Sequence, residues 1–181
     1  MTIKRTPLVA ALVLALAIGA ATASAGRVTT AGPKMGEKNV VQTAIAAGDF
    51  KTLASLLQKA GLAGTLEGNG PYTVFAPTNA AFAKLKKTAP KTYAAVASDK
   101  ALLKKVLTYH VLAKKVPSPA AIAAAKQNAS VKTVEGEKIK LSLKGGKLFL
   151  NGNSQVIVAD IAASNGVIHA INTVLVPPSA G

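Results

Sequence analysis

The stretch Thr73–Phe82 reads TVFAPTNAAF and predicts a short strand, a turn and the start of a helix. Pro77 fixes its own φ and has no N–H group, so the strand must turn there. Thr78 or Asn79 can then supply an oxygen for the free N–H groups of the next helix. Phe75 and Phe82 fall on either side of the turn as core anchors. The same turn could be a binding edge, although a capped junction explains it more simply.

The sequence on either side of this stretch, up to about Lys126, has the spacing of helices. Apolar residues recur at intervals of three and four, and potential capping residues stand before each run. An alanine-rich run from about Pro119 predicts the last of these helices. The expected capping and terminating positions are Asn39 with Gly48 for one helix and Asp49 with Gly61 for the next, and Ser98 and Asp99 are both expected to open a later helix.

From Val131 onward the apolar period changes to two, which indicates strands. Ile139, Leu141 and Leu143 alternate with polar residues before a Gly-Gly turn, so a hairpin with one wet face is expected. The run Val167–Val176 is apolar on both faces and is typical of a central strand. Helices grouped apart from largely antiparallel strands indicate an α+β protein and not a doubly wound parallel fold.

The first 25 residues have the pattern of a secretory signal peptide. Lys4 and Arg5 precede an apolar run of about 13 residues, and small residues ending in Ala25 follow it. A membrane span needs about 20 apolar residues, so cleavage after Ala25 with no remaining transmembrane segment is expected. We expect a flexible linker over 26–38, one domain over 39–178 and a short tail over 179–181. The protein is therefore predicted to be secreted, into a periplasm or outside the cell.

Three segments of this domain resemble the fasciclin-like, or FAS1, family. They are TVFAPTNAAF at Thr73–Phe82, the triplet Tyr109-His110-Val111, and NGVIHAINTVLVPP at Asn165–Pro178. Their order and spacing make a chance match improbable. The resemblance marks as family positions Thr73, Phe75, Pro77, Thr78, Asn79, Phe82, Tyr109, His110, Asn165, Gly166, His169 and Asn172.

The resemblance implies a wedge of two small, mostly antiparallel β-sheets packed with several α-helices. It also implies a secreted or cell-surface adhesion module that binds matrix or glycan, without catalysis. One departure from the family pattern is Asn172, which stands where the family leads us to expect an aspartate and removes a negative charge.

The composition provides few of the side chains that catalysis, cofactor binding or metal binding would require. The chain has no cysteine, which excludes disulfides, thiolate zinc sites and cysteine nucleophiles, and it has two histidines. It contains no G-x-S-x-G, P-loop, dinucleotide or H-E-x-x-H motif. A hydrolase could be imagined from Asp160, Ser164 and His169, and this remains the enzymatic alternative. We expect no enzyme activity, no cofactor and no metal.

Both histidines are expected to be buried and hydrogen-bonded in a neutral form. Tyr109 and His110 are neighbours that would enter a strand with their side chains on opposite faces. The tyrosine hydroxyl would then reach a backbone or side-chain partner. The other reading makes His110 a pH-sensitive ligand or proton carrier.

Lysine dominates the charge. The chain has 22 Lys and Arg against 7 Asp and Glu, giving a formal net charge of +15. Such a field favours polyanions, so we expect contact with anionic polysaccharide, another cell-surface or matrix component, or, peripherally, an anionic membrane surface. Arginine and exposed aromatic residues are scarce, so no dedicated nucleic-acid site is expected. The alternative is a lysine surface that serves only solubility. The candidate binding residues are Lys84, Lys86, Lys87, Lys104, Lys105, Lys114, Lys115, Lys138, Lys140, Lys144 and Lys147.

Overall fold

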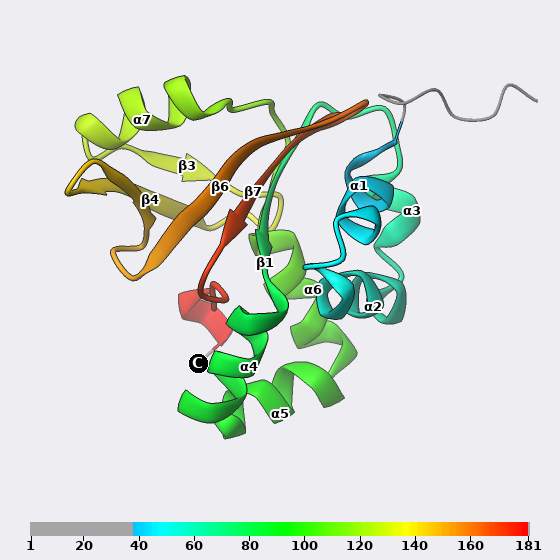
Figure 1. Cartoon of the computed structure of the whole chain (residues 1–181). Helices are drawn as coiled ribbons and strands as arrows, with labels where there is room; N and C mark the ends of the chain where they lie inside the picture. The colour runs from blue at the N-terminus through cyan, green and yellow to red at the C-terminus, as the bar shows by residue number, and fades with distance from the viewer. Residues whose placement is uncertain (1–37, 181) are drawn as a thin grey trace, which may run out of the picture. The chain divides into compact units, whose positions relative to one another are not determined.

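The computed structural model describes residues 38–180, shown in colour in Figure 1. The predicted signal peptide over 1–25 and all of the predicted linker except Lys38 lie outside these residues. In the described part of the chain, no helix is long and apolar enough to span a membrane.

The helices begin where the sequence supplies side-chain acceptors. Asn39 and Gln42 form a reciprocal capping box at the first helix, Thr78 caps the fourth, and Asp99 caps the sixth. Gly61 ends the second helix in the left-handed conformation, with φ at 71°. The helices are α1 (Val40–Ala46), α2 (Lys51–Ala60), α3 (Ala63–Leu66), α4 (Asn79–Thr88), α5 (Pro90–Ser98), α6 (Lys100–Tyr109), α7 (Ser118–Lys126) and the 3-10 helix η1 (Pro178–Ala180).

Seven strands follow one another in the hydrogen-bonded order β2-β1-β7-β6-β5-β4-β3. The pair β1–β7 is parallel and the other pairs are antiparallel. The α+β class is therefore confirmed. The strands are β1 (Tyr72–Pro77), β2 (Val111–Leu112), β3 (Ser130–Lys132), β4 (Lys138–Lys144), β5 (Lys147–Leu150), β6 (Ser154–Ala163) and β7 (Gly166–Ile171).

The family resemblance implied two small sheets. In the structure, strand β6 pairs with strands of both and so connects them. Its first residues, Ser154 and Gln155, pair with β5, whereas Val156–Ala163 pair with β7. Two shifts of register interrupt the pairing with β7. Such irregularities bend a strand, which allows one strand to belong to both halves.

Strand β7 is central, as predicted, but shorter than the run Val167–Val176. All its residues from Gly166 to Ile171 are buried between β1 and β6. The Asn172 N–H still donates to the Gln155 carbonyl of β6, but the Leu175 N–H donates to a side chain, the His110 ring. The chain therefore leaves the sheet after the polar pair Asn172 and Thr173, although Val174–Val176 are again apolar.

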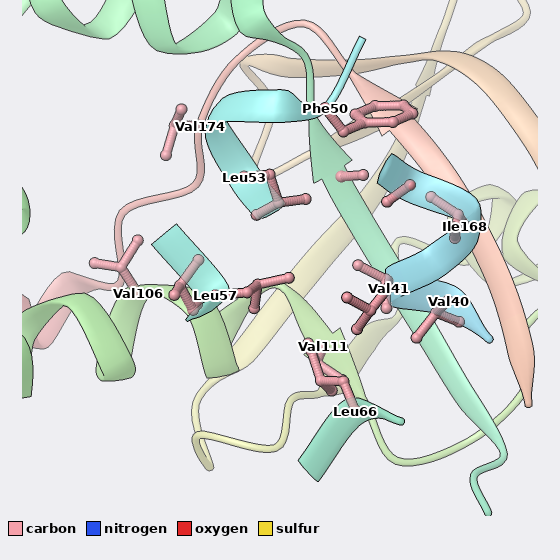
Figure 2. Packing of buried hydrophobic residues seen from close by; sticks show 14 of the residues in the cluster. Val40, Val41, Phe50, Leu53, Leu57, Leu66, Val106, Val111, Ile168 and Val174 are labelled. Atoms are coloured by element: carbon pink, nitrogen blue, oxygen red, sulfur yellow. The ribbon is translucent and has the colours of Figure 1, made fainter. Parts of the chain in front are cut away.

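Strands β1 and β7 separate two hydrophobic clusters, because alternate residues of a strand point to opposite faces. Val74 and Ile168 belong to the cluster under α1, α2 and α6, which Figure 2 shows from close by. Phe75 and Ile171 belong to the other cluster, with the apolar face of β4 and α7. Figure 1 shows α7 beside β3 and β4, away from α1, α2 and α3. The two core anchors predicted around the turn are both buried, Phe75 in the second cluster and Phe82 in the first.

The cap of α2 differs from the prediction. Asp49 does not cap this helix; the Asn79 side chain does, accepting from the Thr52 N–H at 3.0 Å and from the Thr52 hydroxyl at 3.0 Å. The Asn79 amide also donates to the Gly48 carbonyl. Folding brings a distant acceptor to α2, so the local candidate is not used.

The triplet Tyr109-His110-Val111 also differs from the prediction. Tyr109 is the last residue of α6 and His110 is its C-cap, so the pair ends a helix and does not enter a strand. The strand that follows, β2, is very short. The i, i+3, i+4 spacing of Leu103, Val106 and Leu107 continues the helix up to this point.

Candidate functional site

Five lysines share one face of the three strands β3, β4 and β5. In antiparallel pairs, residues directly opposite each other lie on the same face. The register pairs Lys132 with Lys138 and Lys144 with Lys147. Lys140 lies on that face between Lys138 and Lys144, and all five lysines are exposed. We call this surface the lysine face: Lys132, Lys138, Lys140, Lys144 and Lys147.

The lysine face has no acidic residue among the positions that the register places on it. Its other positions are Ser130, Ser142, Phe149 and Gln155. The Lys144 ammonium lies 5.5 Å from the centre of the Phe149 ring, a cation–π contact. The opposite face carries Ile139, Leu141 and Leu150, which are fully buried. The alternation therefore separates a core face from a strongly positive, solvent-exposed face.

The structure distributes the other predicted lysines over different elements. Lys84, Lys86 and Lys87 lie on α4, Lys104 and Lys105 on α6, and Lys114 and Lys115 after β2. Lys105 lies 4.0 Å from Glu135 and donates to the Ser179 carbonyl. Lys84 donates to the Thr173 hydroxyl.

Lys132 completes the lysine face although it was not among the candidates drawn from the sequence. It stands alone in the sequence, without a lysine neighbour. The pairing of β3 with β4 places it opposite Lys138. Alternation around a predicted hairpin could reveal the β4–β5 lysines, but only the strand register reveals this one.

His110 is buried, and both its ring nitrogens bond to the backbone. Nδ1 donates to the Val106 carbonyl at 2.7 Å, and Nε2 accepts the Leu175 N–H at 3.0 Å. These bonds select the neutral imidazole with its proton on Nδ1. Burial lowers the pKa of His110 to about 4, although the bond to Val106 acts in the opposite direction. His110 is therefore neutral at physiological pH. It links the C-terminal end of α6 to the segment that follows β7.

Tyr109 is buried beside His110 but bonds in a different direction. Its hydroxyl donates to the Lys138 carbonyl at 3.1 Å and accepts from the Asn151 amide at 2.9 Å. Burial raises the pKa of the Tyr109 phenol. The phenol thus links the end of α6 to the backbone of β4 at Lys138, one of the residues of the lysine face.

The residues of the hydrolase alternative do not form a catalytic triad. The Asp160 backbone N–H donates to His169 Nδ1 at 3.2 Å, and His169 Nε2 donates to the Val116 carbonyl at 2.9 Å. The Asp160 carboxylate instead accepts from the Ser118 N–H and hydroxyl. The Ser164 N–H donates to the Lys38 carbonyl. A triad needs the carboxylate on the imidazole and the imidazole on the hydroxyl, and neither contact is present in these residues.

Asp160 serves as the N-terminal cap of α7 from a distant strand. The hydroxyl of Ser118 is the largest cause that holds the pKa of the Asp160 carboxyl below its ordinary value, and the Ser118 N–H and His169 contribute less. Asp160 has a positive φ of 59° within β6. Between Lys38 and Ala180, no three His, Asp or Glu side chains are grouped as metal ligands.

The family model called Fasciclin domain matches residues 48–177. The chain belongs to this family. The fold is also similar to part of a solved chain that holds a FAS1 domain pair from the insect cell adhesion molecule fasciclin I, with a TM-score of 0.69 at 16% identity. That match covers 79% of this chain and 52% of the insect chain. The resemblance found in the sequence is therefore confirmed, and the chain is a member of a family of adhesion-type modules.

Relatives of this fasciclin domain occur in bacteria and in mammals. Protein sll1483 of Synechocystis is 40% identical over 77% of this chain and 73% of its own length. Immunogenic protein MPB70 of Mycobacterium bovis is 36% identical over 61% of this chain and 52% of its own. Transforming growth factor-beta-induced protein ig-h3 of Sus scrofa is 34% identical over 72% of this chain but only 18% of its own. The match to this chain thus spans only a small part of the length of the mammalian protein.

The family positions of this fasciclin domain hold segments together. The Asn165 side chain accepts the Val40 N–H at 2.9 Å and donates to the Leu66 and Gly68 carbonyls, both at 2.7 Å. The buried Thr73 hydroxyl donates to the Lys114 carbonyl at 2.7 Å and accepts the Val116 N–H at 2.8 Å. These polar side chains satisfy backbone groups at the start of α1, at the end of α3 and in the segment after β2.

Asn172 takes a role that needs no charge. Its side-chain oxygen accepts the Gln155 N–H at 3.0 Å and the Thr173 hydroxyl at 3.1 Å. An amide oxygen and a carboxylate oxygen can both accept these bonds. The expected aspartate is therefore not required for this contact in the present fasciclin domain.

Proposed function

We propose that this fasciclin domain is a secreted, non-catalytic binding module that attaches to anionic polysaccharide of the cell surface or matrix through its lysine face. The observation that carries the proposal is the pairing of Lys132 with Lys138 and of Lys144 with Lys147 directly across neighbouring strands. Like charges opposite each other destabilise a sheet. A set of such pairs without an acidic neighbour on the same face is suited to a ligand that supplies the negative charge.

The chemistry of the lysine face favours a polysaccharide over a nucleic acid. Lysine ammonium groups bind carboxylate and sulfate as point charges, whereas base recognition favours arginine forks. Phe149 is the aromatic residue that the register places on the lysine face, and it is half-buried under Lys144. One half-buried ring gives no row of platforms for successive bases.

The experiment compares two variants with the same change in net charge. In the first, Lys138, Lys140 and Lys147 of the lysine face are all changed to Gln. In the second, Lys86, Lys87 and Lys91, which are exposed on α4 and α5, are all changed to Gln. Binding to immobilised heparin and to alginate is measured for each protein at two salt concentrations.

We expect the first variant to lose at least about tenfold in affinity and the second to lose much less. The wild-type affinity should fall steeply with added salt because ion pairs with a polyanion release counterions. Equal losses in the two variants would show that net charge alone attracts the polymer. Wild-type protein that does not bind either polysaccharide would support the alternative of a surface that serves solubility.

A further inference from the structure

A hollow of about 230 Å³ opens beside the cluster shown in Figure 2, between α3, the end of α6, β1 and β2. Its floor consists of Leu66, Leu107 and Val111, all buried members of that cluster. Figure 2 shows Leu66 and Val111 next to each other. At the mouth, Val134 keeps 45% of its surface exposed. The hydrophobic core is thus reachable from solvent at this place.

The polar groups around the hollow are mostly engaged elsewhere. The Tyr72 hydroxyl donates to the Thr65 carbonyl at 3.3 Å, so the ring of Tyr72 remains as an apolar wall. The Thr108 hydroxyl donates back to the Lys104 carbonyl at 2.9 Å. Water in a cavity needs two to four polar partners, and an apolar cavity of about 150 Å³ stays dry and takes up benzene. Because the lining is almost wholly apolar and the Tyr72 and Thr108 hydroxyls are already bonded, water finds few partners here and a hydrocarbon chain is the favoured occupant.

The lining contains no charged residue, but two lysines stand close to it along the chain. Lys104 lies one helical turn before Thr108 on α6, and Lys114 follows Ala113 of the lining; both lysines are exposed. Glu135, next to Val134, lies 4.0 Å from Lys105. Glu67 is exposed at the end of α3. Because lysines outnumber carboxylates around the mouth, an anionic headgroup is favoured there.

We infer that this hollow is a second binding site, which takes the hydrocarbon chain of a fatty-acid-like amphiphile and leaves its carboxylate at the lysine rim. The site uses apolar contacts and not an array of ion pairs, so it does not depend on the proposed polysaccharide binding. The chain would replace water against Leu66, Leu107 and Val111, which is favourable in proportion to the apolar area covered.

The probes are hexanoate, octanoate and decanoate, each used below its micelle concentration, with binding followed by methyl and amide NMR shifts. We expect saturable shifts at Leu66, Leu107, Val111 and Val134. Affinity should rise by roughly fourfold for each methylene that enters the hollow. Wild-type protein with no saturable shift, or with shifts centred on other exposed apolar residues, would overturn the inference.

Two substitutions test the place of binding. Ala113→Trp should fill the mouth and weaken decanoate binding by at least about tenfold. Ala123→Trp, on the exposed side of α7, is the matched control and should leave the affinity unchanged. If Ala113→Trp does not fold, Thr65→Trp blocks the opposite side of the mouth. A folded mouth variant that binds decanoate as the wild type does would contradict the proposed site.

A charge pair tests the headgroup. Neutralising Lys104 and Lys114 together to Gln should weaken decanoate by about twofold to fivefold, the range of an exposed ion pair. Neutralising Lys51 and Lys126 gives the same change in net charge at exposed positions on α2 and α7, two helices that contribute no residue to the lining of the hollow. Equal effects of the two double variants would show that the rim lysines do not position the carboxylate.

Discussion

His110 is a buried imidazole whose two nitrogens both bond to the backbone, and it makes the fold sensitive to acid. The folded imidazole takes up a proton only near pH 4, whereas the unfolded one does so near 6.5. Between these values the unfolded state binds more protons, so stability is full above about pH 6.5 and falls as the pH falls. Stability falls with falling pH because the pKa of His110 is lower in the folded state than in the unfolded state.

We expect the free energy of unfolding to decrease by up to about 1.4 kcal/mol per pH unit in this window, about 3 kcal/mol in total. Urea denaturation at several pH values measures it. The variant His110→Gln should be less stable at pH 7 but should lack this part of the pH dependence, while His169 is present in both proteins. A His110 ring that titrates near 6.5 by NMR would contradict the expectation.

At the scale of elements, the parallel pair β1–β7 depends on a glycine. A Cβ atom at Gly166 would overlap the Tyr72 carbonyl in the neighbouring strand. We therefore expect Gly166→Ala to destabilise the protein by about 1–3 kcal/mol, the usual cost of overpacking. The matched control is Gly64→Ala in α3, where a Cβ meets open space. Alanine there should be neutral or stabilising by up to about 1 kcal/mol in chemical denaturation. Equal effects at the two positions would refute the steric explanation.

Helix α7 depends on a cap that comes from β6. Asp160→Asn keeps an acceptor oxygen and tolerates the positive φ, so it should cost only a few tenths of a kcal/mol. Asp160→Ala removes the acceptor and should cost about 1 kcal/mol or more. Because the pKa of the Asp160 carboxyl is lowered, its contribution is present above about pH 4 and is lost below it. Thermal unfolding and amide exchange at Ser118 measure the effect; faster exchange in Asp160→Asn than in Asp160→Ala would contradict it.

At the scale of the whole molecule, positive charge is poorly compensated. The described residues contain one ion pair within 4.0 Å, between Lys105 and Glu135, in a chain of net charge +15. Repulsion among the lysines should destabilise the folded state at low salt. Raising NaCl from about 0.01 to about 0.15 M shortens the screening length from about 30 to about 8 Å.

We expect this salt to raise the melting temperature by roughly 2–4 °C, which corresponds to about 1 kcal/mol. The variant in which Lys138, Lys140 and Lys147 are changed to Gln should respond less, because it carries less repulsion on the lysine face. Differential scanning calorimetry measures both proteins. A melting temperature that stays constant or falls with NaCl would show that the lysines are far enough apart to be independent.

Much of the fold could be predicted because its signals act over a few residues. Asn39 caps the helix that follows it, as does Asp99, and Gly61 ends a helix in the conformation that glycine adopts most easily. The alternation of Ile139 and Leu141 with lysines predicted the β4–β5 hairpin. That hairpin carries most of the lysine face. The α+β class followed from these local periods.

The sequence by itself therefore determined most of the elements, their class and the family, since capping, turns and hydrophobic period depend on neighbours along the chain. Tertiary structure alone decided that Asn79 caps α2, that Asp160 caps α7, and that Lys132 stands opposite Lys138. It also decided that the carboxylate, the imidazole and the serine of the imagined hydrolase bond to other partners. Each of these outcomes depends on which distant groups folding brings within hydrogen-bond or strand-pairing distance, and that proximity is not encoded in local spacing.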